Sequence, residues 1–295
     1  MKLAVVSSVF SNYQLEHVLP IVARAGYVGI DLWGGRPHVF RSDLGPSRLR
    51  ALRRQAADLG LEIASVMPAF YRYPFSLTTN DDRIRRDSLD YMKESIDNAV
   101  LLGATSVLTV PGRSLHGQGR EDAWARMSDS LSTVADIGAA AGVRIGVEAV
   151  NHYVSDLVVN ADDALRLITP LSRDNLGVVL DSGHIHLARQ SGVEEVHSVG
   201  PLLYQVHLND NDGNKHQGLV PGEGSFNYQP LLRALHETHF PGFLSVELSW
   251  DYNVDPEPHV TAAALRIREW MSRLGAPTRE GPHGTPAAEA PRGGR

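Results

Sequence analysis

Apolar stretches alternate with amphipathic ones along most of the chain. In four places a helical-looking stretch ends in a glycine and an apolar run follows, around Gly26, Gly60, Gly103 and Gly142. Glycine just past a helix end adopts the left-handed conformation without the steric cost of a Cβ atom. Helices and strands that alternate throughout are typical of βα units and a parallel sheet.

Eight apolar runs predict strands and six amphipathic stretches predict helices. The strands are expected at Leu3–Ser7, Val28–Trp33, Glu62–Met67, Ser106–Val110, Arg144–Ala149, Leu176–Asp181, Tyr204–Asn209 and Leu244–Leu248. The helices are expected at Ser47–Leu59, Asp81–Leu102, Ala123–Ala141, Ala161–Ile168, Gln229–Thr238 and Pro258–Leu274. Runs such as LGVVLD are apolar without alternation, which indicates strands covered on both faces.

Eight such units predict an α/β fold, a (β/α)₈ TIM barrel that forms a single catalytic domain over residues 1–275. The alternative is an open doubly wound sheet, but no G-x-G-x-x-G follows the first strand, so its dinucleotide-binding form is disfavoured. Residues 276–295 are rich in Pro, Gly and Ala without periodicity and are predicted to be a disordered tail.

Composition and charge narrow the class of protein. Of the 295 residues, 42% are hydrophobic and 21% are charged, as in ordinary globular proteins, and no apolar stretch is long enough for a transmembrane helix. The start, MKLAVVSSVF, is predicted to be the first strand rather than a signal peptide. The absence of cysteine excludes disulfides and thiolate zinc sites and fits a cytoplasmic protein. A net charge of −6 argues against a nucleic-acid partner.

Four consecutive predicted strands each carry a possible metal ligand close to the carboxyl end. Successive ligands are 33, 26 and 40 residues apart, and each gap holds one helix with its loops. In a barrel, the carboxyl ends of all strands converge on one face, where active sites are built. The four residues are Glu148, Asp181, His207 and Glu247.

Each of these residues alone has a structural explanation: Asp181 as a helix cap, His207 as a core histidine, and each glutamate as a buried carboxylate paired with an arginine. Together, however, three acids at one end of a barrel would repel one another unless a cation lay among them. We therefore expect a divalent metal. Three carboxylates and one imidazole without sulfur favour Mn²⁺, with Mg²⁺ or Co²⁺ as alternatives, over zinc.

The strand-end set resembles the metal site of the xylose-isomerase-like TIM-barrel superfamily of sugar isomerases and epimerases. That superfamily includes D-tagatose/D-psicose 3-epimerases and inosose isomerases. The D-x-x-H pattern of DSGHIH is similar to the epimerase pattern, which implies that His184 contacts the substrate. The stretches GYVGIDLWGGRPHVF, YPFSLTTNDDRIRRDSLDYMK and VPGEGSFNYQPLLRAL resemble fructoselysine 3-epimerases, and the resemblance covers most of residues 1–275.

The resemblance implies an enzyme of carbohydrate metabolism, a metal-dependent epimerase or isomerase of a ketose, keto-sugar or sugar conjugate. The metal would polarise the carbonyl, and a proton would leave the neighbouring carbon to give an enediolate. Glu148 and Glu247 would exchange that proton while also binding metal. No organic cofactor is expected, and a homo-oligomer is left open.

The substrate-binding residues depart from the epimerase pattern. His152 stands where an arginine is usual, and Val154 stands where a second glutamate would contact the sugar. After the seventh strand, Lys215 or His216 takes the place of a sugar-binding arginine. Trp33 follows the second strand, where it would either stack on a sugar or belong to the core. The reaction type is therefore better determined than the sugar.

Three other functions are compatible with parts of the pattern. A lyase of the C-glycoside deglycosidase type would eliminate an aglycone from a 3-keto-glycoside with the same metal and base, and would require a small second subunit. An endonuclease-IV-like enzyme would need a trinuclear zinc site and a basic DNA-binding face, neither of which is evident. A sugar-binding barrel without activity would not need the two glutamates.

Overall fold

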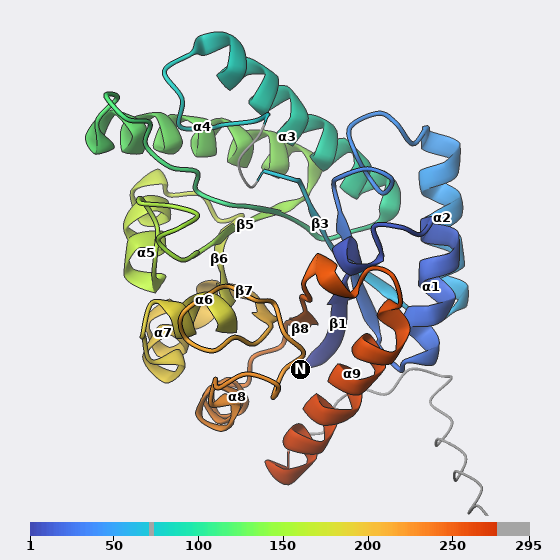
Figure 1. Ribbon diagram of the computed structural model, residues 1–295. Helices are drawn as coiled ribbons and strands as arrows, with labels where there is room; N and C mark the ends of the chain where they lie inside the picture. Colours follow the sequence, from blue (N-terminus) through green and yellow to red (C-terminus); the bar gives the residue numbers. More distant parts are fainter. Residues whose placement is uncertain (71–73, 276–295) are drawn as a thin grey trace, which may run out of the picture.

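The computed structural model of the protein describes residues 1–70 and 74–275, and the tail predicted at 276–295 lies outside the described residues. Eight parallel strands pair in sequence order and close into a barrel. Figure 1 shows the strands at the centre with the helices arranged around them. The prediction of a single-domain (β/α)₈ barrel is confirmed.

The observed strands agree with the predicted ones to within two residues at each end. They are β1 Lys2–Val6, β2 Gly29–Trp33, β3 Glu62–Met67, β4 Ser106–Thr109, β5 Arg144–Glu148, β6 Leu176–Asp181, β7 Leu203–Leu208 and β8 Phe243–Val246. Apolar runs of this length were readily located because both faces of each strand are covered, as their nearly continuous burial indicates.

The α-helices are α1 Leu15–Arg24, α2 Pro46–Asp58, α3 Asp82–Leu102, α4 Arg120–Ala141, α5 Ala161–Ile168, α6 Ser182–Leu187, α7 Gly192–Val199, α8 Tyr228–Glu237 and α9 Pro256–Arg273. Short 3₁₀ helices are η1 Ser7–Phe10, η2 Thr169–Leu171, η3 Gly200–Leu202 and η4 Trp250–Tyr252. In residues 1–70 and 74–275, no helix is both long and apolar enough to cross a membrane.

Three of these helices were not among those predicted. Helix α1 contains Pro20, which normally disfavours a helix interior, but its buried face of Leu15, Val18, Leu19 and Val22 holds it against the barrel. Helices α6 and α7 are too short to give a clear sequence pattern. His184 lies on helix α6, a helix that the sequence did not predict.

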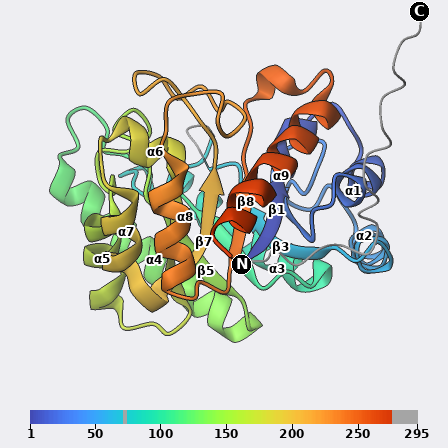
Figure 2. The same ribbon diagram turned by 90° about the horizontal axis from the view of Figure 1, so that it is seen from below.

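The first and last strands of the described chain pair with each other and close the barrel. Strand β1 pairs in parallel with both β2 and β8. Outside the strands, the Tyr27 hydroxyl donates a 2.7 Å hydrogen bond to the Val260 carbonyl, and Arg24 lies 2.9 Å from Glu257. Helix α9 therefore lies beside the first βα unit, and Figure 2 shows α8 and α9 flanking β8. This closure fixes β8 relative to β7 and β1.

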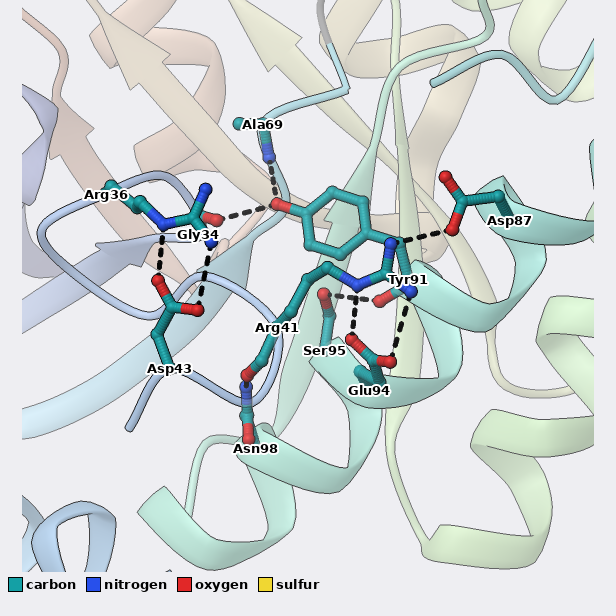
Figure 3. A network of polar contacts seen from close by, with 10 residues as sticks. All are labelled: Gly34, Arg36, Arg41, Asp43, Ala69, Asp87, Tyr91, Glu94, Ser95 and Asn98. Carbon is teal, nitrogen blue, oxygen red and sulfur yellow. Dashed lines mark hydrogen bonds and ion pairs between the residues drawn. The ribbon is translucent and has the colours of Figure 1, made fainter. Parts of the chain in front are cut away.

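Helix α3 anchors the loops that follow β2 and β3 through a buried tyrosine (Figure 3). The Tyr91 hydroxyl donates to the Gly34 carbonyl at 2.7 Å and accepts from the Ala69 backbone N–H at 2.8 Å. Arg41, from the first loop, lies between Asp87 and Glu94 of α3 at 2.7 and 2.8 Å. The two loops are thus held by the same helix.

The role of Tyr91 can be tested by removing its hydroxyl. In Tyr91→Phe, two backbone groups lose their partner, so we expect the free energy of unfolding to fall by about 1–3 kcal/mol. Urea denaturation would measure this free energy of unfolding. Tyr13→Phe is the control, because the Tyr13 hydroxyl makes one surface hydrogen bond to Val254, and we expect a change below about 0.5 kcal/mol. Equal losses in both variants would contradict the anchoring role.

Candidate active site at the carboxyl ends of four strands

The structure brings the four strand-end residues together. Three of them lie on β5, β6 and β7 and the fourth directly follows β8, and these four strands are successive neighbours in the barrel. One ligand atom from each lies within 4.8 Å of the ligand atoms of the others. The four residues, hereafter the ligand cluster, are Glu148, Asp181, His207 and Glu247.

His207 lies between the two glutamates of the ligand cluster. Its Nδ1 atom is 2.9 Å from Oε1 of Glu148 and 3.1 Å from Oε2 of Glu247. The His207 side chain is fully buried, Glu148 is nearly so, and the Glu247 side chain remains 30% exposed. The two carboxylates therefore approach one nitrogen atom from different strands, and only Glu247 is substantially open to solvent.

The charges of the ligand cluster favour the binding of a cation. Burial, together with the charges of Glu148 and Glu247, raises the pKa of Asp181 well above its usual value. Burial also raises the pKa of Glu148, against the effect of His207. Burial alone would lower the pKa of His207, but the two glutamates reverse this and raise it well above normal. Protons thus relieve the repulsion, and a divalent cation would relieve it without them. Three carboxylates and an imidazole so close together fit such an ion.

Asp181 has the two roles that the sequence presented as alternatives. Its Oδ1 atom accepts the backbone N–H of His184 at 2.8 Å and so caps helix α6. Its Oδ2 atom accepts a 2.6 Å hydrogen bond from the Asn209 side chain. The cap and the amide fix the orientation of the carboxylate within the ligand cluster.

His184 is buried and its tautomer is set by its neighbours. The Asn151 side-chain amide lies 2.8 Å from Nδ1 of His184, and the other end of that amide accepts the Tyr153 backbone N–H at 2.9 Å. The amide nitrogen must therefore donate to Nδ1, which leaves the proton of a neutral imidazole on Nε2. Burial and the charges of His216 and His207 lower the pKa of His184 well below normal, so the ring is neutral. Its Nε2–H is available to donate a hydrogen bond.

A second, smaller group of possible ligands shares Asp181 with the ligand cluster. It consists of Asp181, His184 and His216, whose ligand atoms also lie within 4.8 Å of one another. The rings of His184 and His216 are stacked with centroids 4.5 Å apart. His216 is exposed, in contrast to the buried His184. The group is therefore open to the solvent side of the site.

A cavity of about 620 Å³ opens beside the ligand cluster. A cavity of about 400 Å³, lined by residues such as Lys2, Glu62 and Phe243 near the amino ends of strands, contains none of the ligand residues. The larger cavity is lined by Ser8, Trp33, Met67, Pro68, Ala69, Phe70, Val110, Glu148, Val150, His184, His216, Glu247 and Trp250.

Of the five residues predicted to bind substrate, three line this cavity and two do not. Trp33, His184 and His216 belong to the lining. His152 is exposed and its ring packs on Tyr153 at 3.9 Å, outside the lining. Lys215 is also exposed, on a turn in which its backbone N–H donates to Asp212. His152 and Lys215 were expected to take the place of sugar-binding arginines, but neither of them lines this cavity.

Sequence reasoning missed a group of polar residues inside the barrel beneath the ligand cluster. The Ser65 hydroxyl donates to Oδ1 of Asp31 at 2.5 Å, and the Gln205 side chain lies 3.3 Å from Nε2 of His207 and 3.0 Å from Ser245. All are buried. A signal existed, because Gln205 and His207 are two residues apart on β7 and therefore face the same side of the strand.

The comparisons with known proteins agree with the barrel fold. The profile of the family described as "Xylose isomerase-like TIM barrel" matches residues 19–274. Fructoselysine 3-epimerase from Shigella flexneri is 27% identical over 254 residues, which is 86% of this chain and 92% of that protein.

Two solved structures share the fold. A D-tagatose 3-epimerase-like protein superposes with a TM-score of 0.82 at 21% identity, over 93% of this chain and 98% of the other. IOLI protein with a bound zinc atom superposes with a TM-score of 0.78 at 22% identity, over 93% and 99%. The predicted resemblance is confirmed, and the chain belongs to the xylose isomerase-like TIM barrel family.

Proposed function

We propose that the protein is a divalent-metal-dependent epimerase or isomerase that acts on a ketose or keto-sugar by moving a proton next to the carbonyl. The observation that carries this proposal is the ligand cluster, in which two glutamates flank one buried histidine. The similarity to a fructoselysine 3-epimerase over most of both chains supports the reaction class. The fold shared with a D-tagatose 3-epimerase-like protein is consistent with it.

The residues that would hold the metal are those of the ligand cluster. Their oxygen-rich donor set favours Mn²⁺, with Mg²⁺ or Co²⁺ as alternatives, and the zinc bound in the structurally similar IOLI protein supports a divalent ion. When bound, such an ion would polarise the substrate carbonyl and stabilise the negative charge that develops on its oxygen. The four side chains would hold the ion beside the cavity that would admit the substrate.

The two glutamates are the proposed proton carriers. One carboxylate takes a proton from the carbon beside the carbonyl, and the electron pair of the broken C–H bond moves into the enediolate. The other glutamate, which enters the step protonated, returns its proton to that carbon on the opposite face, which inverts the carbon, and proton exchange with solvent then restores both side chains. His184 donates its Nε2–H to a substrate oxygen and so holds the sugar between the carboxylates. No oxidant, reductant or organic cofactor takes part.

Elimination by a lyase receives no support from the fructoselysine 3-epimerase or the D-tagatose 3-epimerase-like protein described above. We therefore do not propose it, and with it the expectation of a small second subunit is set aside. The cytoplasmic location stays a prediction, and the oligomeric state stays open.

The metal assignment is tested by Asp181→Asn. The substituted side chain keeps an oxygen to cap α6 but loses its charge, so we expect the fold to persist and metal affinity to fall more than about 10-fold. Elemental analysis after dialysis would measure the metal content, which we expect to be about one ion per chain in the unaltered protein. Asp251→Asn is the control. Asp251 is exposed and lies outside the ligand cluster, so this substitution should leave the metal content unchanged. Full metal content in Asp181→Asn would contradict the assignment.

The two-carboxylate mechanism is tested by Glu148→Gln and Glu247→Gln. Glutamine can still offer an oxygen to a metal but has almost no basicity, so each variant should lose turnover while retaining the fold. One of them should still exchange the substrate proton with solvent, because the carboxylate on that face remains. Incubation with ketoses in D₂O, followed by NMR, would detect both turnover and proton exchange. Loss of exchange in both variants with metal still bound would exclude two carboxylate carriers.

The role of His184 is tested by His184→Ala. Loss of one hydrogen bond to the reacting sugar should lower kcat/KM by about 10- to 100-fold, or about 1.4–2.8 kcal/mol, with metal content unchanged. His152→Ala, outside the cavity lining, should change kcat/KM less than about twofold. A drop in metal content in His184→Ala would instead assign His184, with His216, to metal binding.

A further inference from the structure

The wall of the active-site cavity away from the ligand cluster is largely apolar. Within residues 1–70 and 74–275, 13 residues line the cavity; 8 of them are apolar, and none is a lysine, arginine, asparagine or glutamine. A sugar hydroxyl that leaves water without a hydrogen-bond partner costs free energy. This part of the cavity therefore offers few hydrogen bonds to sugar hydroxyls. The apolar residues are Trp33, Met67, Pro68, Ala69, Phe70, Val110, Val150 and Trp250.

Trp33 is held in place by contacts with Ser7 and His38. Its backbone N–H donates to the Ser7 hydroxyl at 2.9 Å, and its ring packs edge-on against His38, with centroids 5.9 Å apart. Gly35 permits this position, because a Cβ atom there would lie 2.1 Å from the Trp33 ring. The ring is therefore a fixed part of the wall.

Phe70 is fixed by the same helix that anchors the loops after β2 and β3. Its ring stacks on Tyr91 with centroids 5.5 Å apart and an interplanar angle of 7°. The Tyr91 hydroxyl bonds the backbone at Gly34 and at Ala69, the residue before Phe70 (Figure 3). The apolar wall is thus built before any ligand arrives, which lowers the entropic cost of binding.

Trp250 completes the wall and is left uncovered. It follows β8 on helix η4, its ring lies 5.3 Å from that of Trp33, and 55% of the residue is exposed. A large aromatic ring that lines a cavity and remains exposed is typical of a binding site rather than of a core. The open ring faces a cavity whose 620 Å³ lies within the range of about 300–1,000 Å³ seen for sites that enclose drug-sized ligands.

We propose that the substrate is a keto-sugar that carries an apolar substituent, an aryl or alkyl group, rather than a free sugar. This inference rests on the proposed function for the position of the keto-sugar end, beside the ligand cluster and His184. The substituent lies along Trp33, Phe70 and Trp250, where its burial supplies affinity that the sugar cannot obtain from this wall. The competing explanation, in which the apolar wall only excludes water around a small sugar, is separated from it by the experiment.

The experiment compares keto-sugars that differ only in the substituent. One pair is methyl and phenyl 3-keto-D-glucoside, and the other is D-fructose and 1-deoxy-1-benzylamino-D-fructose. The full chain loaded with Mn²⁺ is incubated with each in D₂O, and proton exchange gives kcat/KM while quenching of tryptophan fluorescence gives Kd. We expect the aryl member of at least one pair to bind at least 10-fold more tightly, about 1.4 kcal/mol, and to exchange faster.

The variants assign the preference to the wall. Trp250→Ala should lower the ratio of aryl to non-aryl affinity at least fivefold. Val254→Ala is the control, because Val254 follows on the same loop, is 81% exposed and does not line the cavity, so the ratio should be unchanged. Equal or weaker binding of the aryl member in both pairs overturns the inference. A ratio that Trp250→Ala leaves unchanged overturns the placement of the substituent.

Failure of the proposed function gives a different result. Absence of proton exchange with all four compounds at full metal content, together with tighter binding of the aryl members, would overturn the epimerase proposal but keep the apolar site. Exchange with D-fructose and the methyl glycoside at rates equal to those of the aryl compounds would keep the epimerase proposal and overturn the substrate class.

Discussion

The repulsion among three carboxylates, two of them buried and one partly exposed, around one imidazole is the interaction on which the rest of this structure depends. Glu148, Asp181 and Glu247 would bring three negative charges to a place where His207 supplies at most one positive charge. Charges taken out of water in this way are costly unless they are compensated. Adjacent strands of a closed barrel nevertheless enforce their proximity. The site is thus prepared for a cation, and a barrel with such a face is expected to do chemistry rather than merely to fold.

The same constraint explains the polar residues beneath and beside the ligand cluster. Asn209 donates to Asp181, Asn151 fixes the tautomer of His184, and Gln205 lies against the inner nitrogen of His207. Each of these contacts restricts the direction in which a ligand or donor atom points. Groups placed around a metal site in this way usually determine the orientation and basicity of the ligands. Their burial in the barrel is reasonable only because each contacts another polar group.

The active-site cavity combines two kinds of surface with separate structural supports. The polar side rests on strand ends, where backbone pairing fixes the side chains. The apolar side comes from the ends of β2 and β3 and from the segments after β3, β4, β5 and β8, and α3 anchors the loops after β2 and β3 through Tyr91. Proton transfer and selection of the substrate are therefore expected to depend on different elements. Loop changes could alter the preferred sugar derivative while the strand ends remain the same.

The sequence by itself determined the barrel and the ligand cluster. Apolar runs marked the eight strands because both faces of each are buried, and a polar residue after such a run falls at the carboxyl end. That reasoning located Glu148, Asp181, His207 and Glu247 without any contact being known. Only the tertiary structure decided which loop residues reach the cavity. His152 and Lys215 occupy promising sequence positions but are exposed outside it, while Phe70 and Trp250 line it. Loop conformation depends on contacts between distant residues, such as Tyr91 with Gly34, and these leave no local pattern in the sequence.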